Sequence, residues 1–67
     1  MARTLKQAVK ELSKNGHTTI SQQILNDHYL GDIKVLMFDF QQHNIPVTVL
    51  RVGPDHCWSY ALELNKS

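Results

Sequence analysis

The stretch from Asp32 to His43 is the strongest constraint on the fold, because it carries the periodicity of an amphipathic helix. The apolar residues of its inner face recur at i, i+3, i+4 and i+7; they are Ile33, Leu36, Met37 and Phe40. Asp32 follows Gly31 and is expected to cap the helix, since its carboxylate can accept hydrogen bonds from the amides of the first turn. We therefore predict a helix over residues 33–43 with one face in the core.

The opposite face of this helix presents two apolar side chains, Val35 and Phe38, to solvent. Its polar members are Lys34, Gln41 and Gln42, with Asp39 at the edge. A surface helix does not normally expose large apolar groups unless they contact something. This outer face is therefore the candidate binding surface of the chain.

The length of 67 residues is sufficient for one domain, residues 1–67, with a small core. A domain of this size buries about 60% of the surface of its unfolded chain. Because 42% of the residues are hydrophobic, we expect a packed core rather than a disordered chain. Two structural layers and one shallow surface site fit this size, whereas a deep catalytic pocket does not.

The net charge of +1 does not by itself indicate nucleic-acid binding, but the charges are unevenly distributed. Four of the seven basic residues lie near the amino end: Arg3, Lys6, Lys10 and Lys14. The middle of the chain is mildly acidic. The lysines would line the solvent side of a first helix, where they form either a solvated face or a contact with an acidic partner or a DNA backbone.

The cysteine content and the hydropathy pattern predict a cytoplasmic protein. One cysteine, Cys57, excludes an internal disulfide and is typical of a reducing compartment. No apolar run approaches the roughly 20 residues that cross a bilayer. The first residues lack the apolar segment of a secretory signal. No contact with a membrane is expected.

Residues 4–14 are predicted to form the first helix. Thr4 and Gln7 have the spacing of a capping box, and Gly16 suits the left-handed geometry at a helix end. The apolar stripe of this helix consists of Leu5, Ala8, Val9 and Leu12. This pattern places one face of the helix against the core.

A second helix is predicted over residues 20–28, because Thr19 and Gln22 repeat the capping-box spacing. Tyr29 falls on the outer side of this helix. Residues 17–19 are β-prone and form either a connector or a short strand. Whether that strand pairs with a later part of the chain stays open.

A β-hairpin is predicted over residues 46–64. Its first strand is rich in β-branched residues, and its four-residue turn is Gly53-Pro54-Asp55-His56. Its second strand, residues 57–64, alternates so that one face carries Trp58, Tyr60, Leu62 and Leu64. A lone hairpin is marginally stable in water, so we expect this face to pack on the helices.

The predicted order resembles that of winged helix-turn-helix DNA-binding domains. Residues 20–28, 29–31 and 33–43 correspond to the helix-turn-helix, and residues 53–56 correspond to the tip of the wing. The fold class implied is α+β, a small winged helix with three helices followed by a C-terminal β-hairpin. In that family the third helix enters the major groove, and the wing contacts phosphates or the minor groove.

A narrower resemblance is to the winged helices that bind left-handed nucleic acid. Thr18-Thr19, Pro54 and Trp58 match the threonine pair and the proline–tryptophan wing of that group. Lys34 and Phe38 stand where that group carries asparagine and tyrosine, so both recognition side chains differ.

The first functional hypothesis is a small DNA-binding regulator of transcription that binds double-stranded DNA. The residues expected in the major groove are Lys34, Phe38, Gln41 and Gln42. Lysine can contact guanine, glutamine can bridge the edge of adenine, and an aromatic ring can contact a thymine methyl group. Arg51 and His56 would contact phosphates from the wing. Asp32 and Asp39 argue against this hypothesis, because phosphate binding draws on positive charge.

The alternative hypothesis is a modulator or inhibitor that has the shape of a winged helix and binds a protein. Val35 and Phe38 would form the contact, either with a protein partner or with a second copy of the chain. Aromatic and apolar anchors of this kind carry much of the binding energy in protein interfaces.

Metal binding and catalysis are not expected. The four histidines, His17, His28, His43 and His56, lie in separate predicted elements, without the spacing of a zinc site. His56 and Cys57 are adjacent, so in a strand they point to opposite faces and cannot form a nucleophile–base pair. Asp39 and His43 are four residues apart and are predicted to pair on one helix. We expect no cofactor and no enzymatic activity.

Overall fold

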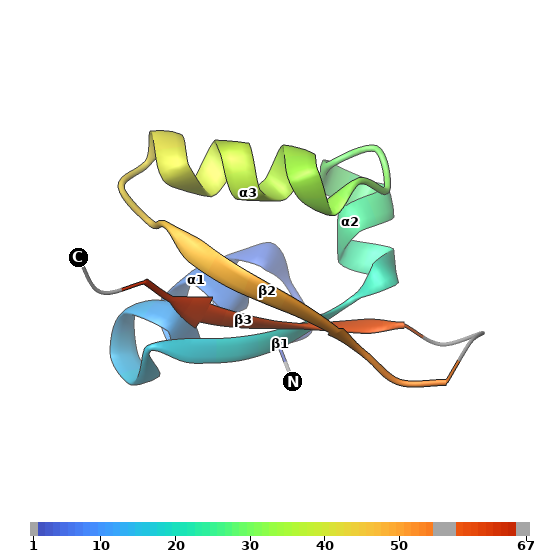
Figure 1. Cartoon of the computed structure of the whole chain (residues 1–67), viewed down its shortest axis with the longest axis horizontal. Helices are drawn as coiled ribbons and strands as arrows, with labels where there is room; N and C mark the ends of the chain where they lie inside the picture. The colour runs from blue at the N-terminus through green and yellow to red at the C-terminus, as the bar shows by residue number, and fades with distance from the viewer. Residues whose placement is uncertain (1, 55–57, 66–67) are drawn as a thin grey trace.

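Three helices and a three-stranded antiparallel sheet form an α+β domain, which the computed structural model describes for residues 2–54 and 58–65. The elements follow in the order α1 (Leu5–Asn15), β1 (His17–Ser21), α2 (Gln22–His28), α3 (Ile33–Gln42), β2 (Val47–Val52) and β3 (Ser59–Leu64). In Figure 1, α3 lies above β2, and α1 lies behind the strands. The helices therefore cover one face of the sheet.

The predicted boundaries of α1 are confirmed to within one residue. Both ends of the helix are capped. The Thr4 hydroxyl accepts a hydrogen bond from the backbone N–H of Gln7 (3.1 Å), and the Gln7 side chain accepts one from the N–H of Arg3 (2.9 Å). Gly16 follows the helix with a φ of 82°, and its N–H donates to the carbonyl of Leu12. These bonds satisfy backbone groups that a helix end otherwise leaves without partners.

α3 begins where the sequence predicts, because the Asp32 carboxylate accepts from the N–H of Lys34 (2.9 Å). Leu36 and Phe40 are buried, as expected of its inner face. The expectation that Met37 is buried is wrong, since this side chain is 37% exposed. Met37 lies at the margin of the apolar stripe, where it lines a shallow groove beside Pro46, Val47 and Asn65.

The predicted start of the second helix is also wrong. Residues 17–21 form a strand, α2 begins only at Gln22, and the side chain of Ser21 makes no capping hydrogen bond. Thr18 and Ile20 are buried on the sheet, so tertiary packing outweighs the local capping-box pattern. The expected order of three helices followed by a hairpin is corrected accordingly, because β1 lies between α1 and α2.

The strand order is β1-β3-β2, so β3 is central and pairs antiparallel with both neighbours. Ile20 lies opposite Tyr60, and Tyr60 lies opposite Arg51. The question left open about residues 17–19 is thereby answered, since they pair with β3. In the hairpin, Val52 lies opposite Ser59, so the connection is longer than the four residues predicted. Residues 55–57 of that connection lie outside the described residues.

One hydrophobic cluster joins the helices to the inner face of the sheet. Its largest fully buried side chains are Leu12, Ile20, Leu25, Leu36 and Leu62. The predicted alternation of β3 is confirmed at Tyr60 and Leu62, which are buried, whereas Trp58 and Leu64 are half-buried at the ends. The other face of the sheet carries exposed Leu50 and Val52, and no described residue forms a layer over it.

Truncating a core leucine should destabilise the domain far more than truncating a leucine on the open face of the sheet. Leu62 is 1% exposed and Leu50 is 64% exposed. We expect Leu62→Ala to lower the free energy of unfolding by about 2–5 kcal/mol, because it removes buried methyl groups and leaves a cavity. Leu50→Ala should change it by no more than about 0.5 kcal/mol. Urea denaturation followed by circular dichroism measures both; equal losses would contradict the assignment of the two faces.

Candidate functional site

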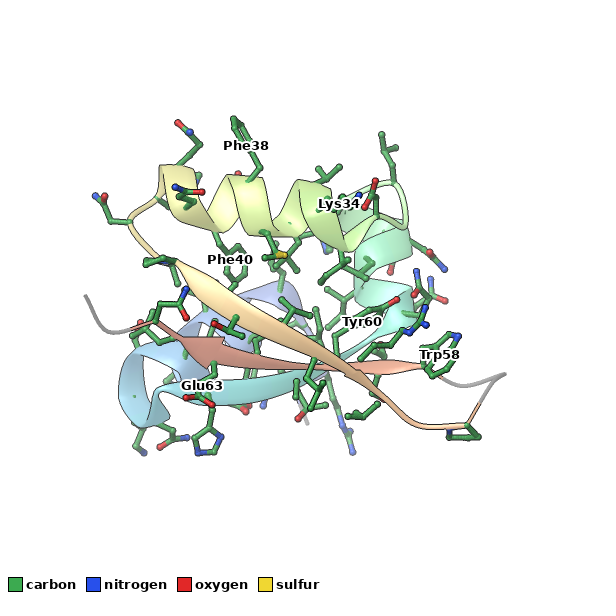
Figure 2. The ribbon with its side chains drawn as sticks, viewed as in Figure 1. Lys34, Phe38, Phe40, Trp58, Tyr60 and Glu63 are labelled. Carbon is green, nitrogen blue, oxygen red and sulfur yellow. The ribbon has the colours of Figure 1, made fainter. Side chains whose placement is uncertain are left out.

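The outer face of α3 brings together five of the predicted site residues. Lys34, Val35, Phe38, Gln41 and Gln42 are all exposed, and Phe38 is 66% exposed. Figure 2 shows Phe38 pointing away from the sheet and Phe40 pointing toward it. The amphipathic pattern of α3 therefore leaves exposed polar side chains together with two apolar ones, Val35 and Phe38.

A further exposed apolar side chain lies in the turn before α3, since Leu30 is 93% exposed. Leu30 also has a φ of 56°, a left-handed conformation that costs a non-glycine residue about 1–2 kcal/mol. A leucine immediately before a glycine in a tight turn was the available signal, since such positions usually carry polar residues.

Asp39, at the edge of the outer face, has two partners within the domain. The Tyr29 hydroxyl donates to Asp39 Oδ2 (2.8 Å), and His43 Nδ1 lies 3.5 Å from Asp39 Oδ1. The predicted pairing of Asp39 with His43 is thereby confirmed. The placement of Tyr29 on the outside is wrong, since it is only 6% exposed and its ring packs edge-on against Phe40.

The environment of Tyr29 also changes its acidity. Burial raises the pKa of the Tyr29 hydroxyl well above its usual range, and the hydrogen bond to Asp39 and the charge of that carboxylate raise the pKa further. Tyr29 therefore stays protonated and keeps Asp39 as an acceptor throughout the neutral range.

Arg51 lies on β2, separate from the α3 residues, with its guanidinium carbon 4.1 Å from the centroid of the Trp58 ring. This is a cation–π contact. The sequence assigned Trp58 to the core, but it is half-buried at the margin of the cluster, and Arg51 itself is exposed. In Figure 2, Lys34 and Trp58 lie toward the same end of the molecule. His56, the other predicted wing contact, lies outside the described residues.

A hydrogen-bonded chain ties the sheet to the turn that precedes α3. The Tyr60 hydroxyl donates to Gln22 Oε1 (2.7 Å), and Gln22 Nε2 donates to the carbonyl of Gly31 (3.2 Å) and to Asn26 Oδ1 (3.0 Å). These bonds link β3, α2 and the start of α3. They hold the amino end of α3 in a defined position relative to the hairpin.

The lysines of α1 form a second basic surface. Lys6, Lys10 and Lys14 are exposed at a spacing of four residues, which places them along one side of the helix. The acidic residue of α1, Glu11, accepts a hydrogen bond from the Thr18 hydroxyl (2.9 Å) instead. The basic surface of α1 belongs to a different element from the outer face of α3.

No group of three or more potential metal ligands occurs among the residues that the structure describes. Within the same residues, no helix has the length and apolar character required of a membrane span. Comparisons with protein-family models, with curated proteins and with solved structures found no match. The geometry of the outer face of α3 and of the Arg51–Trp58 pair therefore carries the functional argument.

The raised pKa of Tyr29 predicts a loss of stability in alkali. Below the pKa of an unfolded tyrosine, about 10, Tyr29 is protonated in both the folded and the unfolded state. Its contribution to the free energy of unfolding is then fully present. Above that pKa, the unfolded state loses its proton first, so the free energy of unfolding should fall as the pH rises. We expect this fall to be shallower in Tyr29→Phe than in the parent protein. Urea denaturation at a series of pH values measures both slopes; parallel curves would contradict the prediction.

Proposed function

We propose that this chain is a winged-helix DNA-binding domain of the kind found in small transcription regulators. The element order supports this proposal, because α2, the turn and α3 are followed by a hairpin, as in the family that the sequence resembles. An α-helix fits the major groove of B-DNA, where base pairs present distinct patterns of donors and acceptors. α3 would enter that groove with its outer face.

The observation that carries the proposal is the composition of this face. Lys34, Gln41 and Gln42 are exposed on it, and these side chains suit the edges of guanine and adenine. Asp39, the carboxylate that would repel phosphates, is held instead by Tyr29 and His43. Asp32 stays exposed at the amino end of the helix, where it serves as a cap.

A second candidate function is binding to a protein, and the exposed apolar groups favour it. Phe38 and Leu30 are among the most exposed large apolar residues of the described chain, and Val35 is exposed on the same helix as Phe38. A contact centred on Phe38 would remove apolar surface from water, which favours association with a partner or with a second copy. The two candidates use the same helix and share Phe38, but only the DNA contact would draw on Lys34, Gln41 and Gln42.

Removing the two cations near the proposed groove should weaken DNA binding strongly. We expect the double variant Lys34→Ala and Arg51→Ala to bind duplex DNA at least about tenfold more weakly, since a base contact contributes about 1–3 kcal/mol. Loss of the Arg51 phosphate contact should also reduce the salt slope by about 1. Fluorescence anisotropy with labelled duplexes of mixed sequence, at two salt concentrations, measures both.

The matched control is Lys6→Ala with Lys10→Ala, which removes the same charge from α1. Its affinity should change by less than about threefold, because screening reduces the effect of exposed charges beyond a Debye length of about 8–10 Å. If both double variants lost affinity equally, binding would depend on net charge and not on the α3 face. If the parent protein bound no duplex DNA at low salt, even at a protein concentration of about 10⁻⁵ M, the DNA proposal would fail.

The protein-binding candidate predicts a different sensitivity. Phe38→Ala should abolish any self-association measured by sedimentation velocity, because truncation of a central aromatic anchor typically costs about 2 kcal/mol or more. Leu50→Ala is the control, since Leu50 is similarly exposed but lies on the open face of the sheet. Self-association that survived Phe38→Ala would place the contact elsewhere.

A further inference from the structure

The cation–π pair at the loop end of the hairpin has a specific origin in the sheet register. Arg51 lies directly opposite Tyr60, and Trp58 lies two residues before Tyr60, immediately before β3 begins at Ser59. Arg51 and Trp58 are therefore diagonal neighbours, at a separation that long and aromatic side chains can bridge. The guanidinium carbon of Arg51 lies 4.1 Å from the ring centroid, so the two groups are in contact.

The pairing leaves the charge of Arg51 available to a ligand. A guanidinium that rests its face on an aromatic ring keeps its five N–H donors, which lie in its plane, free for a ligand. Arg51 is exposed, and no carboxylate in residues 2–54 or 58–65 forms an ion pair with it. A planar arginine with outward donors suits the bidentate recognition of a phosphate group.

We propose that Trp58 is a positioning residue that holds Arg51 ready to bind one phosphate of the DNA backbone beside the groove entered by α3. This inference rests on the proposed DNA-binding function and adds a role that the sequence did not assign to Trp58. An unrestrained arginine loses side-chain freedom when it binds a phosphate, and that loss weakens binding. Contact with the indole restricts the side chain before DNA arrives, so less freedom is lost on binding.

The location of Trp58 fits this role better than a role in the core alone. Tyr60 and Leu62, the next residues on the same face of β3, are buried within the hydrophobic cluster. Trp58 is half-buried at the end of that row, with Arg51 over its ring. The same register that buries Tyr60 beside Arg51 thus brings the arginine and the indole together at the margin of the core.

The pair can first be tested without DNA, because Trp58 is the single tryptophan of the chain. Acrylamide quenching of its fluorescence reports access to the indole. Arg51→Ala should increase the quenching constant, and Arg51→Lys should increase it less, since a lysine retains the charge but not the planar group. An unchanged quenching constant in Arg51→Ala would overturn the inference before any DNA is added.

The decisive experiment is a double-mutant cycle on DNA affinity with Trp58→Leu, Arg51→Ala and the combined variant. Trp58→Leu should weaken duplex binding by about two- to tenfold, the fold-change that matches the loss of freedom of one side chain. In the Arg51→Ala background, Trp58→Leu should cause no further loss of affinity. A residue that acts only through Arg51 has no effect once that side chain is removed. Trp58→Phe retains an aromatic face and should stay within about twofold of the parent.

The outcomes separate this inference from the proposed function. Additive losses for Trp58→Leu and Arg51→Ala, with the parent protein binding DNA normally, would overturn the positioning role alone. Failure of the parent protein to bind duplex DNA would overturn the proposed function and, with it, the role of Arg51. If Trp58→Leu did not fold by circular dichroism, the quenching of Trp58 fluorescence in Arg51→Ala would decide instead, since an unchanged quenching constant there overturns the positioning role.

Discussion

The packing of Leu36 and Phe40 into the core is the contact on which the outer face of α3 depends. Both side chains are buried, and the Phe40 ring meets that of Tyr29 edge-on, with the centroids 6.4 Å apart. Because residues three and four apart share one face of a helix, burying these two orients Phe38 and Lys34 outward. The side chains that the outer face of α3 presents to solvent are thus decided by which side chains of the helix the core buries.

Polar contacts then decide which charges that surface presents. Tyr29 donates a hydrogen bond to Asp39, and Gln22 connects Tyr60 to the turn before the helix. Hydrogen bonds to charged groups contribute more to stability than those between neutral groups. The same interactions that stabilise the fold therefore give the Asp39 carboxylate a partner within the domain and fix the orientation of α3 relative to β3.

The sequence predicted the elements whose determinants are local, and the structure differs where distant contacts decide. The caps at Thr4 and Asp32 involve neighbouring residues, so their spacing alone revealed them. The strand at residues 17–19 stayed an open alternative and its extension to Ser21 was missed, because its pairing partner, β3, lies far along the chain and a capping-box pattern at Thr19 indicated a helix. The Arg51–Trp58 contact likewise depends on a strand register that no local pattern encodes.

The central position of β3 affects the order in which the protein can fold during synthesis. β1 and β2 both pair with β3 and not with each other, and β3 follows them in the chain. A ribosome releases the chain from its amino end at about 5–20 residues per second. Until residues 59–64 emerge, the residues of β1 and β2 have no strand to pair with. The three-stranded sheet, and the core that it shares with the helices, can therefore be completed only after β3 has left the ribosome.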